Sequence, residues 1–214
     1  MKVLVAGGTG FIGSHLCRAL AEAGHEVTAL SRSPAQTPEG VESVVGDVTA
    51  PDSIAAAVDG QDAVVNLVAL SPLFEPKGGN VMHDRIHRAG TENLVRAAES
   101  ADVDRFVQLS ALGADPNGDT AYIRAKGAAE RIVEASDLDW TVFRPSVVFG
   151  EGGEFVSFTK RLKKLFAPLV PLYPLPGGGK TRFQPIHVDD LVSMIVESLE
   201  ADEHIGAIYE IGGP

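Results

Sequence analysis

The strongest constraint on this chain is a short apolar run that ends in a cluster of glycines and continues as a helical pattern. Residues 3–6 read VLVA, residues 7–13 read GGTGFIG, and helical apolar spacing continues from residue 11 to about residue 23. Glycines allow a tight turn and a close approach of the backbone to a pyrophosphate, and a helix N-terminus offers free N–H groups to it. We therefore predict a dinucleotide-binding loop rather than a ligand-free turn, with contacts from Gly7, Thr9, Gly10, Phe11, Ile12 and Gly13.

Short apolar segments alternate with helical ones along most of the chain. We expect strands at 2–6, 25–30, 41–45, 62–70, 105–109 and 140–144, and helices at 11–23, 51–58, 80–100, 122–135 and 190–199. This alternation predicts an α/β fold of the Rossmann type, with a doubly wound parallel sheet. After Pro145 glycines, prolines and basic residues dominate, so we expect one NAD(P)-binding domain over 1–214, with about 150–185 in a small C-terminal substrate lobe.

Composition excludes several other classes of protein. With 29 acidic and 18 basic residues the net charge is −11, which argues against a nucleic-acid partner. The single cysteine, Cys17, excludes an intrachain disulfide and a multi-cysteine metal site, and we expect no metal. The first strand begins almost at Met1, leaving no room for a signal peptide, and no run of ~18 apolar residues is present. We expect a cytoplasmic protein without a transmembrane segment.

The end of the second predicted strand indicates which cofactor is bound. An acidic residue there would bind the adenosine ribose 2′-hydroxyl, but this chain has Ser31 and Arg32. Because arginine pairs bidentately with phosphate, we predict NADP(H) in preference to NAD(H), the alternative being that Arg32 is a solvated loop charge. Asp47, followed by Val48, would accept a hydrogen bond from the adenine amino group, or would only cap the loop before Pro51.

A possible catalytic pair lies in the helix predicted after the fifth strand. Tyr122 and Lys126 are four residues apart and therefore share a helix face. A lysine ammonium there would lower the pKa of the phenol and hold the nicotinamide ribose, making Tyr122 a proton donor or acceptor. Ser110, at the end of the fifth strand, would hydrogen-bond a substrate carbonyl.

Together these motifs resemble the short-chain dehydrogenase/reductase superfamily, in its extended or atypical branch. The resemblance covers nearly the whole chain and is greatest to the epimerase/dehydratase-type group that contains the nucleotide-binding accessory subunit of respiratory complex I. The matching pieces are 7–13, 47–48, 66–69, 90–94, 110–114, 122–126, 144–150 and 184–190. The resemblance implies cofactor contacts from Leu67, Val68, Ala69, Tyr122, Lys126, Pro145 and Val147.

The chain also departs from the pattern of this branch. Ala111 stands where extended epimerases carry a catalytic Ser or Thr, one residue after Ser110, and His87 stands where the family has an asparagine. The alternative for His87 is a solvated helix residue. We expect His187 to pack rather than to donate protons, and Asp189 and Asp190 to cap a helix. The chain is also shorter than the epimerases, so we expect either a minimal substrate lobe or a sequence that is part of a longer protein.

We expect an NADP(H)-dependent oxidoreductase that acts on a carbonyl or alcohol of a small-molecule substrate. A non-catalytic nucleotide-binding scaffold or assembly factor is the first alternative, and a nucleotide-sugar epimerase or dehydratase is the second. The oligomeric state, monomer or homodimer, stays open.

A basic amphipathic pattern occupies residues 155–169. Phenylalanines and leucines recur there at helical spacing beside the cluster Lys160, Arg161, Lys163 and Lys164. Such a helix would touch a membrane surface weakly or cover an apolar substrate pocket, the alternative being a helix packed on its own lobe.

Overall fold

The computed structural model describes residues 1–33, 36–72, 74–153 and 184–213. Seven strands form one sheet in the order β3-β2-β1-β4-β5-β6-β9, and every neighbouring pair is parallel. The strands are β1 Lys2–Ala6, β2 Glu26–Ser31, β3 Val41–Val45, β4 Ala63–Asn66, β5 Arg105–Leu109, β6 Asp139–Pro145 and β9 Ala207–Ile211. The order of the strands reverses at β1, because β2 and β3 extend the sheet on one side of it and β4, β5 and β6 on the other. The predicted doubly wound Rossmann-type fold is therefore confirmed.

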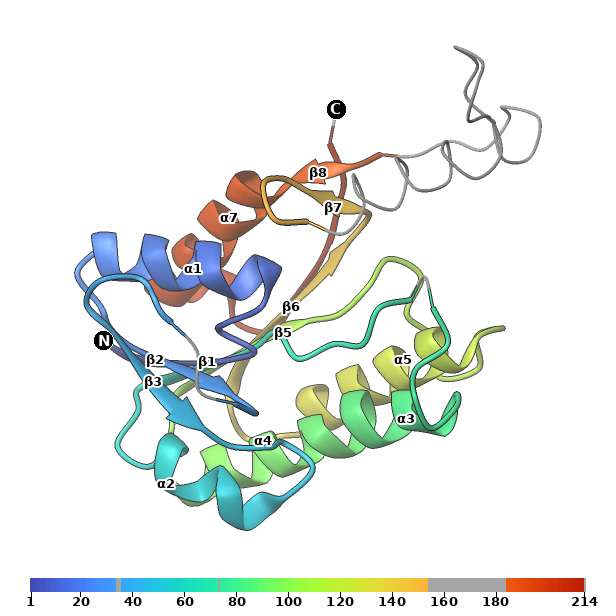
Figure 1. Ribbon diagram of the computed structural model, residues 1–214, viewed down its shortest axis with the longest axis horizontal. Coiled ribbons are helices and arrows are strands. Elements are labelled where there is room, and N and C mark those ends of the chain that lie inside the picture. Colours follow the sequence, from blue (N-terminus) through green and yellow to red (C-terminus); the bar gives the residue numbers. More distant parts are fainter. Residues whose placement is uncertain (34–35, 73, 154–183, 214) are drawn as a thin grey trace.

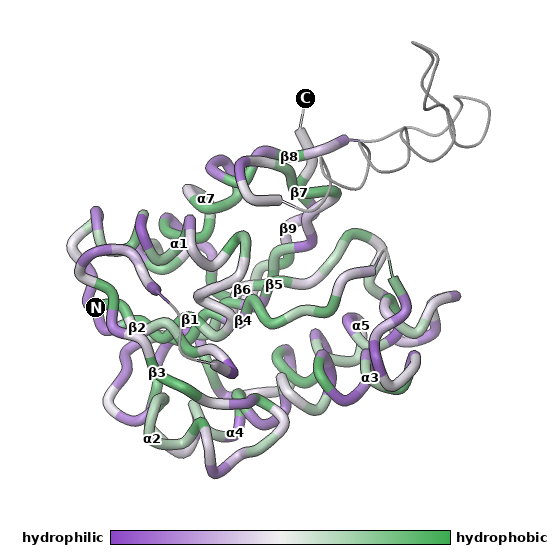
Figure 2. Tube along the Cα trace, in the orientation of Figure 1, coloured by the Kyte–Doolittle hydropathy of each residue, from purple (hydrophilic) through white to green (hydrophobic). Residues whose placement is uncertain are grey.

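Helices cover both faces of this sheet (Figure 1). On one face lie α1 (Phe11–Glu22) and α7 (Val188–Glu200), and on the other lie α2 (Ala55–Val58), α4 (Gly90–Ser100) and α5 (Ala121–Glu134). Successive side chains of a strand point to opposite faces. Val3 and Val5 therefore join the core under α1 and α7, whereas Leu4 joins the core over α4 and α5. Figure 2 shows the apolar central strands enclosed between these layers.

The structure differs from the expected elements most clearly in the fourth strand, the long central helix and the last strand. The fourth strand ends at Asn66 rather than at residue 70, because the chain leaves the sheet after Leu67, whose N–H still bonds Ala6. The helix expected at 80–100 is divided into α3 (Val81–His83), a π-helical segment (Asp84–Ala89) and α4. Strand β9 was not expected, since its side chains are half-buried or exposed at the sheet edge.

A second, two-stranded sheet joins β7 (Val148–Phe149) to β8 (Ile186–His187) in parallel. Most of the expected substrate lobe, including the amphipathic pattern at 155–169, lies outside the described residues. Within the described ranges, no helix is both long enough and apolar enough to cross a membrane.

Candidate functional site

The glycine loop between β1 and α1 has room for backbone only. Gly7 has φ +84°, a left-handed conformation that favours glycine, and its carbonyl accepts the Gly10 N–H at 3.0 Å. A Cβ placed on Gly13 would lie 2.2 Å from the Gly7 carbonyl oxygen, so helix and loop touch through main chain. Among the described residues no side chain caps the N-terminus of α1 at Gly10, which leaves N–H groups there for an anion.

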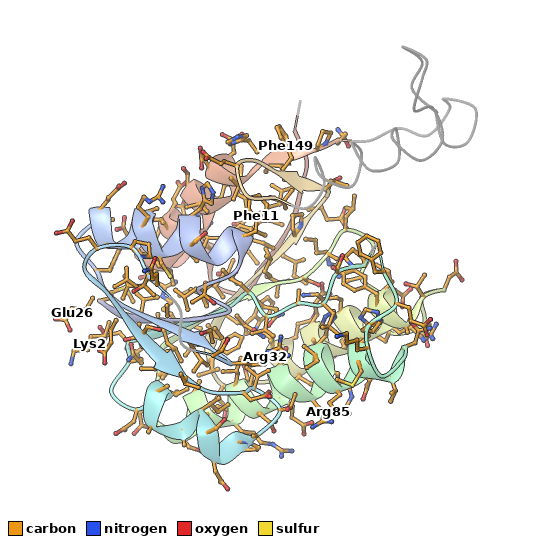
Figure 3. All side chains as sticks on the ribbon, viewed as in Figure 1. Lys2, Phe11, Glu26, Arg32, Arg85 and Phe149 are labelled. Carbon is orange, nitrogen blue, oxygen red and sulfur yellow. The ribbon has the colours of Figure 1, made fainter. Side chains whose placement is uncertain are left out.

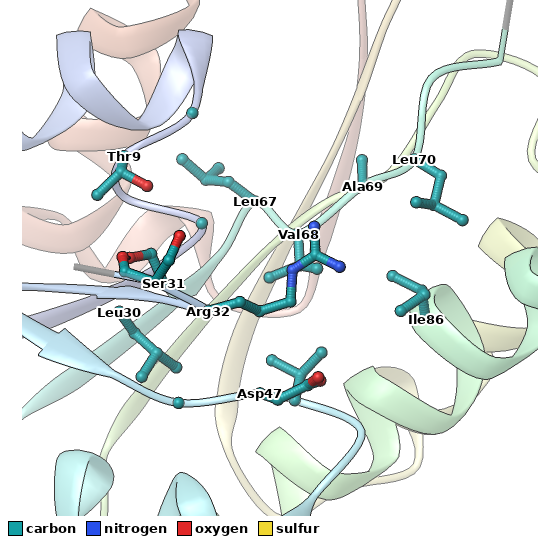
Figure 4. Close-up of a pocket in the computed structure, with 15 residues that line it drawn as sticks. Thr9, Leu30, Ser31, Arg32, Asp47, Leu67, Val68, Ala69, Leu70 and Ile86 are labelled. Carbon is teal, nitrogen blue, oxygen red and sulfur yellow. The ribbon is translucent and has the colours of Figure 1, made fainter. Parts of the chain in front are cut away.

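The carboxyl ends of the first four strands open into a cleft with a volume of about 260 Å³ (Figure 4). Small-molecule sites usually measure ~300–1,000 Å³, so this cleft suits part of a dinucleotide. Its lining contains these predicted cofactor residues: Gly7, Thr9, Gly10, Ser31, Arg32, Asp47, Val48, Leu67, Val68 and Ala69.

The polar wall of the cleft combines one cation and one anion. In Figure 4 the Arg32 side chain extends toward Val68, and Asp47 lies below the Arg32 side chain in this view. Burial alone would raise the pKa of Asp47, but hydrogen bonds from Thr49 N and Oγ1, both 2.8 Å, and the charges of Arg32 and Arg85 lower it. Asp47 is therefore ionised at neutral pH.

Two arginines near the cleft differ from the other arginines there in how they are paired. Within the described ranges neither Arg32 nor Arg85 forms an ion pair, although both act electrostatically on Asp47. Figure 3 shows them away from Lys2 and Glu26, which begin β1 and β2. The Ser31 hydroxyl donates to Ser33 O at 2.7 Å and so shapes the loop that carries Arg32.

Buried polar contacts fix the loop after β4. The Asn66 side-chain amide donates to Thr91 Oγ1 at 3.0 Å and to Gln108 Oε1 at 2.9 Å. Its side-chain oxygen Oδ1 accepts the Val68 N–H at 3.1 Å. Asn93 on α4 donates to Val48 O at 2.7 Å. The Asn66 and Asn93 side chains thus hold the loops that contain Val68 and Val48, two residues that line the cleft.

Tyr122 is half-buried and packs against two buried histidine rings. Its ring centroid is 5.6 Å from that of His83 and 5.3 Å from that of His87, and each pair is edge-to-face. Leu70, which lines the cleft, donates its N–H to His87 Nε2 at 2.9 Å. The nucleotide cleft and the Tyr122 phenol are therefore joined through one imidazole.

The expected effect of Lys126 on Tyr122 is wrong for this structure. Burial raises the pKa of Tyr122 to about 12, and the Lys126 ammonium donates to Leu109 O at 2.8 Å. Burial lowers the pKa of Lys126 to about 8, against the opposing pull of the Glu130 carboxylate. The two residues share a helix face as predicted, but the lysine is directed at the end of β5 rather than at the phenol.

Ser110 follows directly on the strand end that Lys126 holds. Its side chain is 3% exposed, and its Oγ has no hydrogen-bond partner in the described part of the chain. The Nδ1 atoms of His83 and His87 are in the same condition. Buried polar atoms without partners are uncommon in folded proteins and favour a role at a ligand site.

Several predicted cofactor residues lie outside the cleft. Gly13 serves close packing, and the ring of Phe11 faces Gly153, where an added Cβ would approach Phe11 Cζ to 2.9 Å. Ile12 packs on the apolar core. Pro145 O accepts the Leu112 N–H at 3.0 Å, and Val147 O accepts the Ile186 N–H at 2.9 Å.

Sequence reasoning missed part of the cleft and of the ring cluster. The additional lining residues are Leu30, Ser33, Gly46, Leu70 and Ile86. Leu30, Ser33 and Gly46 adjoin predicted strand ends and could have been included on that ground. His83 precedes His87 by four residues, a helical spacing that would have placed both on one face.

The histidines and acids singled out by the sequence have mixed outcomes. His87 is 2% exposed, so its interpretation as a solvated helix residue is wrong. His187 caps α7 by accepting the Asp189 N–H at 3.3 Å, and Asp189 and Asp190 lie in the first turn of that helix. Over the residues that the structure describes, no group of three or more His, Cys, Asp or Glu side chains is arranged to hold a metal ion.

Comparisons with known proteins agree with this geometry. The NAD(P)H-binding family matches residues 7–165. The chain is 31% identical to NADH dehydrogenase [ubiquinone] 1 alpha subcomplex subunit 9 of Arabidopsis thaliana, over 98% of this chain and 53% of that one. It is 33% identical to the 3-diazoavenalumate denitrifying reductase of a Streptomyces species, over 94% and 73% of the two chains.

Among solved structures, MoeE5 in complex with UDP-glucuronic acid and NAD superposes with a TM-score of 0.83 at 26% identity, covering 99% of this chain and 76% of that one. The chain spans about half the length of its Arabidopsis relative. The glycine loop, the parallel sheet and these matches lead to one conclusion. The chain belongs to the NAD(P)H-binding family of Rossmann-fold proteins, within an extended short-chain dehydrogenase/reductase-like group.

Proposed function

We propose that this protein is an NADP(H)-dependent oxidoreductase acting on the carbonyl or alcohol carbon of a small molecule. One observation carries the proposal: Leu70 lines the nucleotide cleft and is hydrogen-bonded to His87, whose ring contacts the Tyr122 phenol. A proton-transferring hydroxyl thus adjoins the site where a nicotinamide cofactor would bind. Homologues that are named reductases support the same reaction class.

The residues of the cleft fit a dinucleotide with a 2′-phosphate. The glycine loop leaves a cradle that a Cβ at Gly13 would fill, and the N-terminus of α1 favours a pyrophosphate. Arg32 directly follows β2, the strand end from which this fold reads the 2′-position of an adenosine ribose, and this supports a 2′-phosphate contact. Arg85 adds positive charge nearby. A 2′-phosphate would satisfy these charges better than a 2′-hydroxyl.

The bound nicotinamide would supply or accept the hydride, and the side chains would handle the proton. With a pKa raised to about 12, the Tyr122 phenol is protonated at neutral pH and suits proton donation to a carbonyl oxygen. The Ser110 hydroxyl, buried and without a described partner, would hydrogen-bond the same oxygen. Lys126 holds the Leu109 carbonyl at the base of this site and is the candidate contact for the nicotinamide ribose.

Tyr122→Phe tests the catalytic role. The variant keeps the ring contacts with His83 and His87, so NADPH affinity should stay within about twofold, while turnover falls roughly 10²–10⁴-fold. NADPH oxidation would be followed with a panel of ketones and aldehydes, and binding by calorimetry. Wild-type turnover in the phenylalanine variant would remove Tyr122 from the mechanism.

Two other functions each have a specific observation in their favour. The 31% sequence identity to a subunit of NADH dehydrogenase favours a nucleotide-bound component of a larger assembly. Such a protein would bind NADPH, and Tyr122→Phe would leave its biological activity unchanged. The similarity to MoeE5 favours a nucleotide-sugar enzyme, which would require NAD to bind at least as tightly as NADP to the wild-type protein.

A further inference from the structure

The histidine cluster beside Tyr122 depends on an unusual helical segment. Asp84–Ala89 is π-helical and joins α3 to α4. π-Helical turns are rare and occur frequently at functional sites. This one contains His87, which is 2% exposed, and follows His83, which is 4% exposed. Their ring centroids are 5.4 Å apart.

The hydrogen bond from Leu70 determines the state of the His87 ring. A backbone N–H can only donate, so the Nε2 atom that accepts it at 2.9 Å carries no proton. The neutral ring then holds its proton on Nδ1, which has no hydrogen-bond partner among the residues described. Burial, followed by the charges of Lys126 and His83, lowers the pKa of His87 to about 2. The acceptor is therefore present throughout the pH range of ordinary assays.

One imidazole thus touches both halves of the site. Leu70 belongs to the loop after β4, whose beginning is held by Asn66 through the Val68 amide. His87 holds the other end of that loop and packs edge-to-face against Tyr122 at 5.3 Å. A displacement of either the loop or the phenol would be resisted by the same side chain.

We propose that His87 is a positioning residue that fixes the Leu70 end of the cofactor loop against Tyr122 through the hydrogen bond it accepts from the Leu70 amide. This inference rests on the proposed function for its catalytic meaning. The hydrogen bond itself can be tested without any substrate.

The test compares His87→Phe, which keeps an aromatic ring but loses the acceptor, with His87→Gln, whose amide oxygen is an acceptor. In the phenylalanine variant the Leu70 amide should exchange with solvent about tenfold faster, and NADPH affinity should fall about tenfold, as expected for one lost hydrogen bond. Glutamine should restore both to within about threefold. His83→Phe, which alters the other ring beside Tyr122, is the matched control and should leave Leu70 exchange unchanged.

Imidazole ¹⁵N shifts of the unsubstituted protein give a measurement that does not depend on the variants folding. They should show Nε2 unprotonated and Nδ1 protonated from pH 5 to pH 8. A protonated Nε2, or a His87→Phe protein with wild-type Leu70 exchange and NADPH affinity, would overturn the inference. If the Leu70 amide exchanges slowly in the unsubstituted protein and faster in His87→Phe, but the unsubstituted protein binds no NADPH, the proposed function is overturned. The hydrogen bond from Leu70 to His87 is then still supported.

Discussion

The two ends of this site are built by different means. The nucleotide cleft is formed by backbone: glycines, strand ends and a helix N-terminus, with Arg32 and Asp47 as its charged side chains. The region around Tyr122 is formed by side chains from α3, the π-helical segment and α5, and by Ser110, which follows β5. Its polar groups are buried, and burial displaces their pKa values. In the proposed function, cofactor recognition would therefore depend on main-chain shape, and proton transfer would depend on side-chain packing.

The largest effect is expected from a substitution in the glycine loop of the cleft. Gly13→Ala places a Cβ 2.2 Å from the Gly7 carbonyl oxygen, and because backbone cannot move aside cheaply, we expect a loss of about 3 kcal/mol in unfolding free energy and of measurable NADPH binding. Urea unfolding and calorimetry would measure both. Gly10→Ala, whose Cβ would meet the same oxygen at 3.2 Å, should be destabilised far less. Equal stability losses in the two variants would contradict the close-packing argument.

The buried groups around Tyr122 should make the stability of the protein depend on pH. The Lys126 pKa is about 8 when folded and near 10.5 in an unfolded chain, so the unfolded state binds more protons between these values and stability rises with pH across this window. The advantage of the unsubstituted protein over Lys126→Met should grow by roughly 3 kcal/mol from pH 8 to pH 10.5. Comparing the two proteins cancels the opposite contributions of Cys17 and Tyr122, whose pKa values are raised.

Denaturant unfolding at several pH values would measure this difference. Lys2→Met removes one exposed lysine and is the control. A pH-independent gap between Lys126→Met and the unsubstituted protein would show that the buried ammonium is not titrating in this range.

Arg32→Ala tests whether the charged side of the cleft distinguishes NADPH from NADH. Loss of a charge-assisted contact with the 2′-phosphate should weaken NADPH binding about 30-fold, or roughly 2 kcal/mol, and NADH binding by less than about threefold. Fluorescence titration of both cofactors would measure the ratio. If the affinities for both fall together, Arg32 supports the loop and does not read the phosphate.

The smallest expected effect belongs to Arg85, whose charge reaches Asp47 without an ion pair. Arg85→Ala should weaken NADPH binding by about twofold to threefold at low salt, and the difference should disappear as ionic strength rises. Arg18→Ala, which removes an exposed arginine from α1, controls for net charge. A loss as large as that of Arg32→Ala would place Arg85 in direct contact with the phosphate.

The same contrast explains which features could be predicted from sequence. Strands β3 and β5 were predicted with their observed bounds, and the glycine motif located the cleft, because local spacing determines both. Helical spacing also placed Tyr122 and Lys126 on one face. It could not tell whether the lysine would reach the phenol or the Leu109 carbonyl, because that choice depends on β5.

Two further features left no local signal. The π-helical widening at Asp84–Ala89 adds one residue to a turn, which apolar periodicity does not resolve. Strand β9 has half-buried and exposed positions in alternation, and its pairing with β6 depends on a segment distant in sequence.

The small β7–β8 sheet has a consequence for how such a chain can vary. Val148 pairs with Ile186 and Phe149 with His187, so the chain leaves the Rossmann core and re-enters it at neighbouring points. Because β7 and β8 are already paired, the entropic cost of closing the chain between them changes only slowly with the number of residues. We therefore expect the core sheet to tolerate different lengths of chain between β7 and β8.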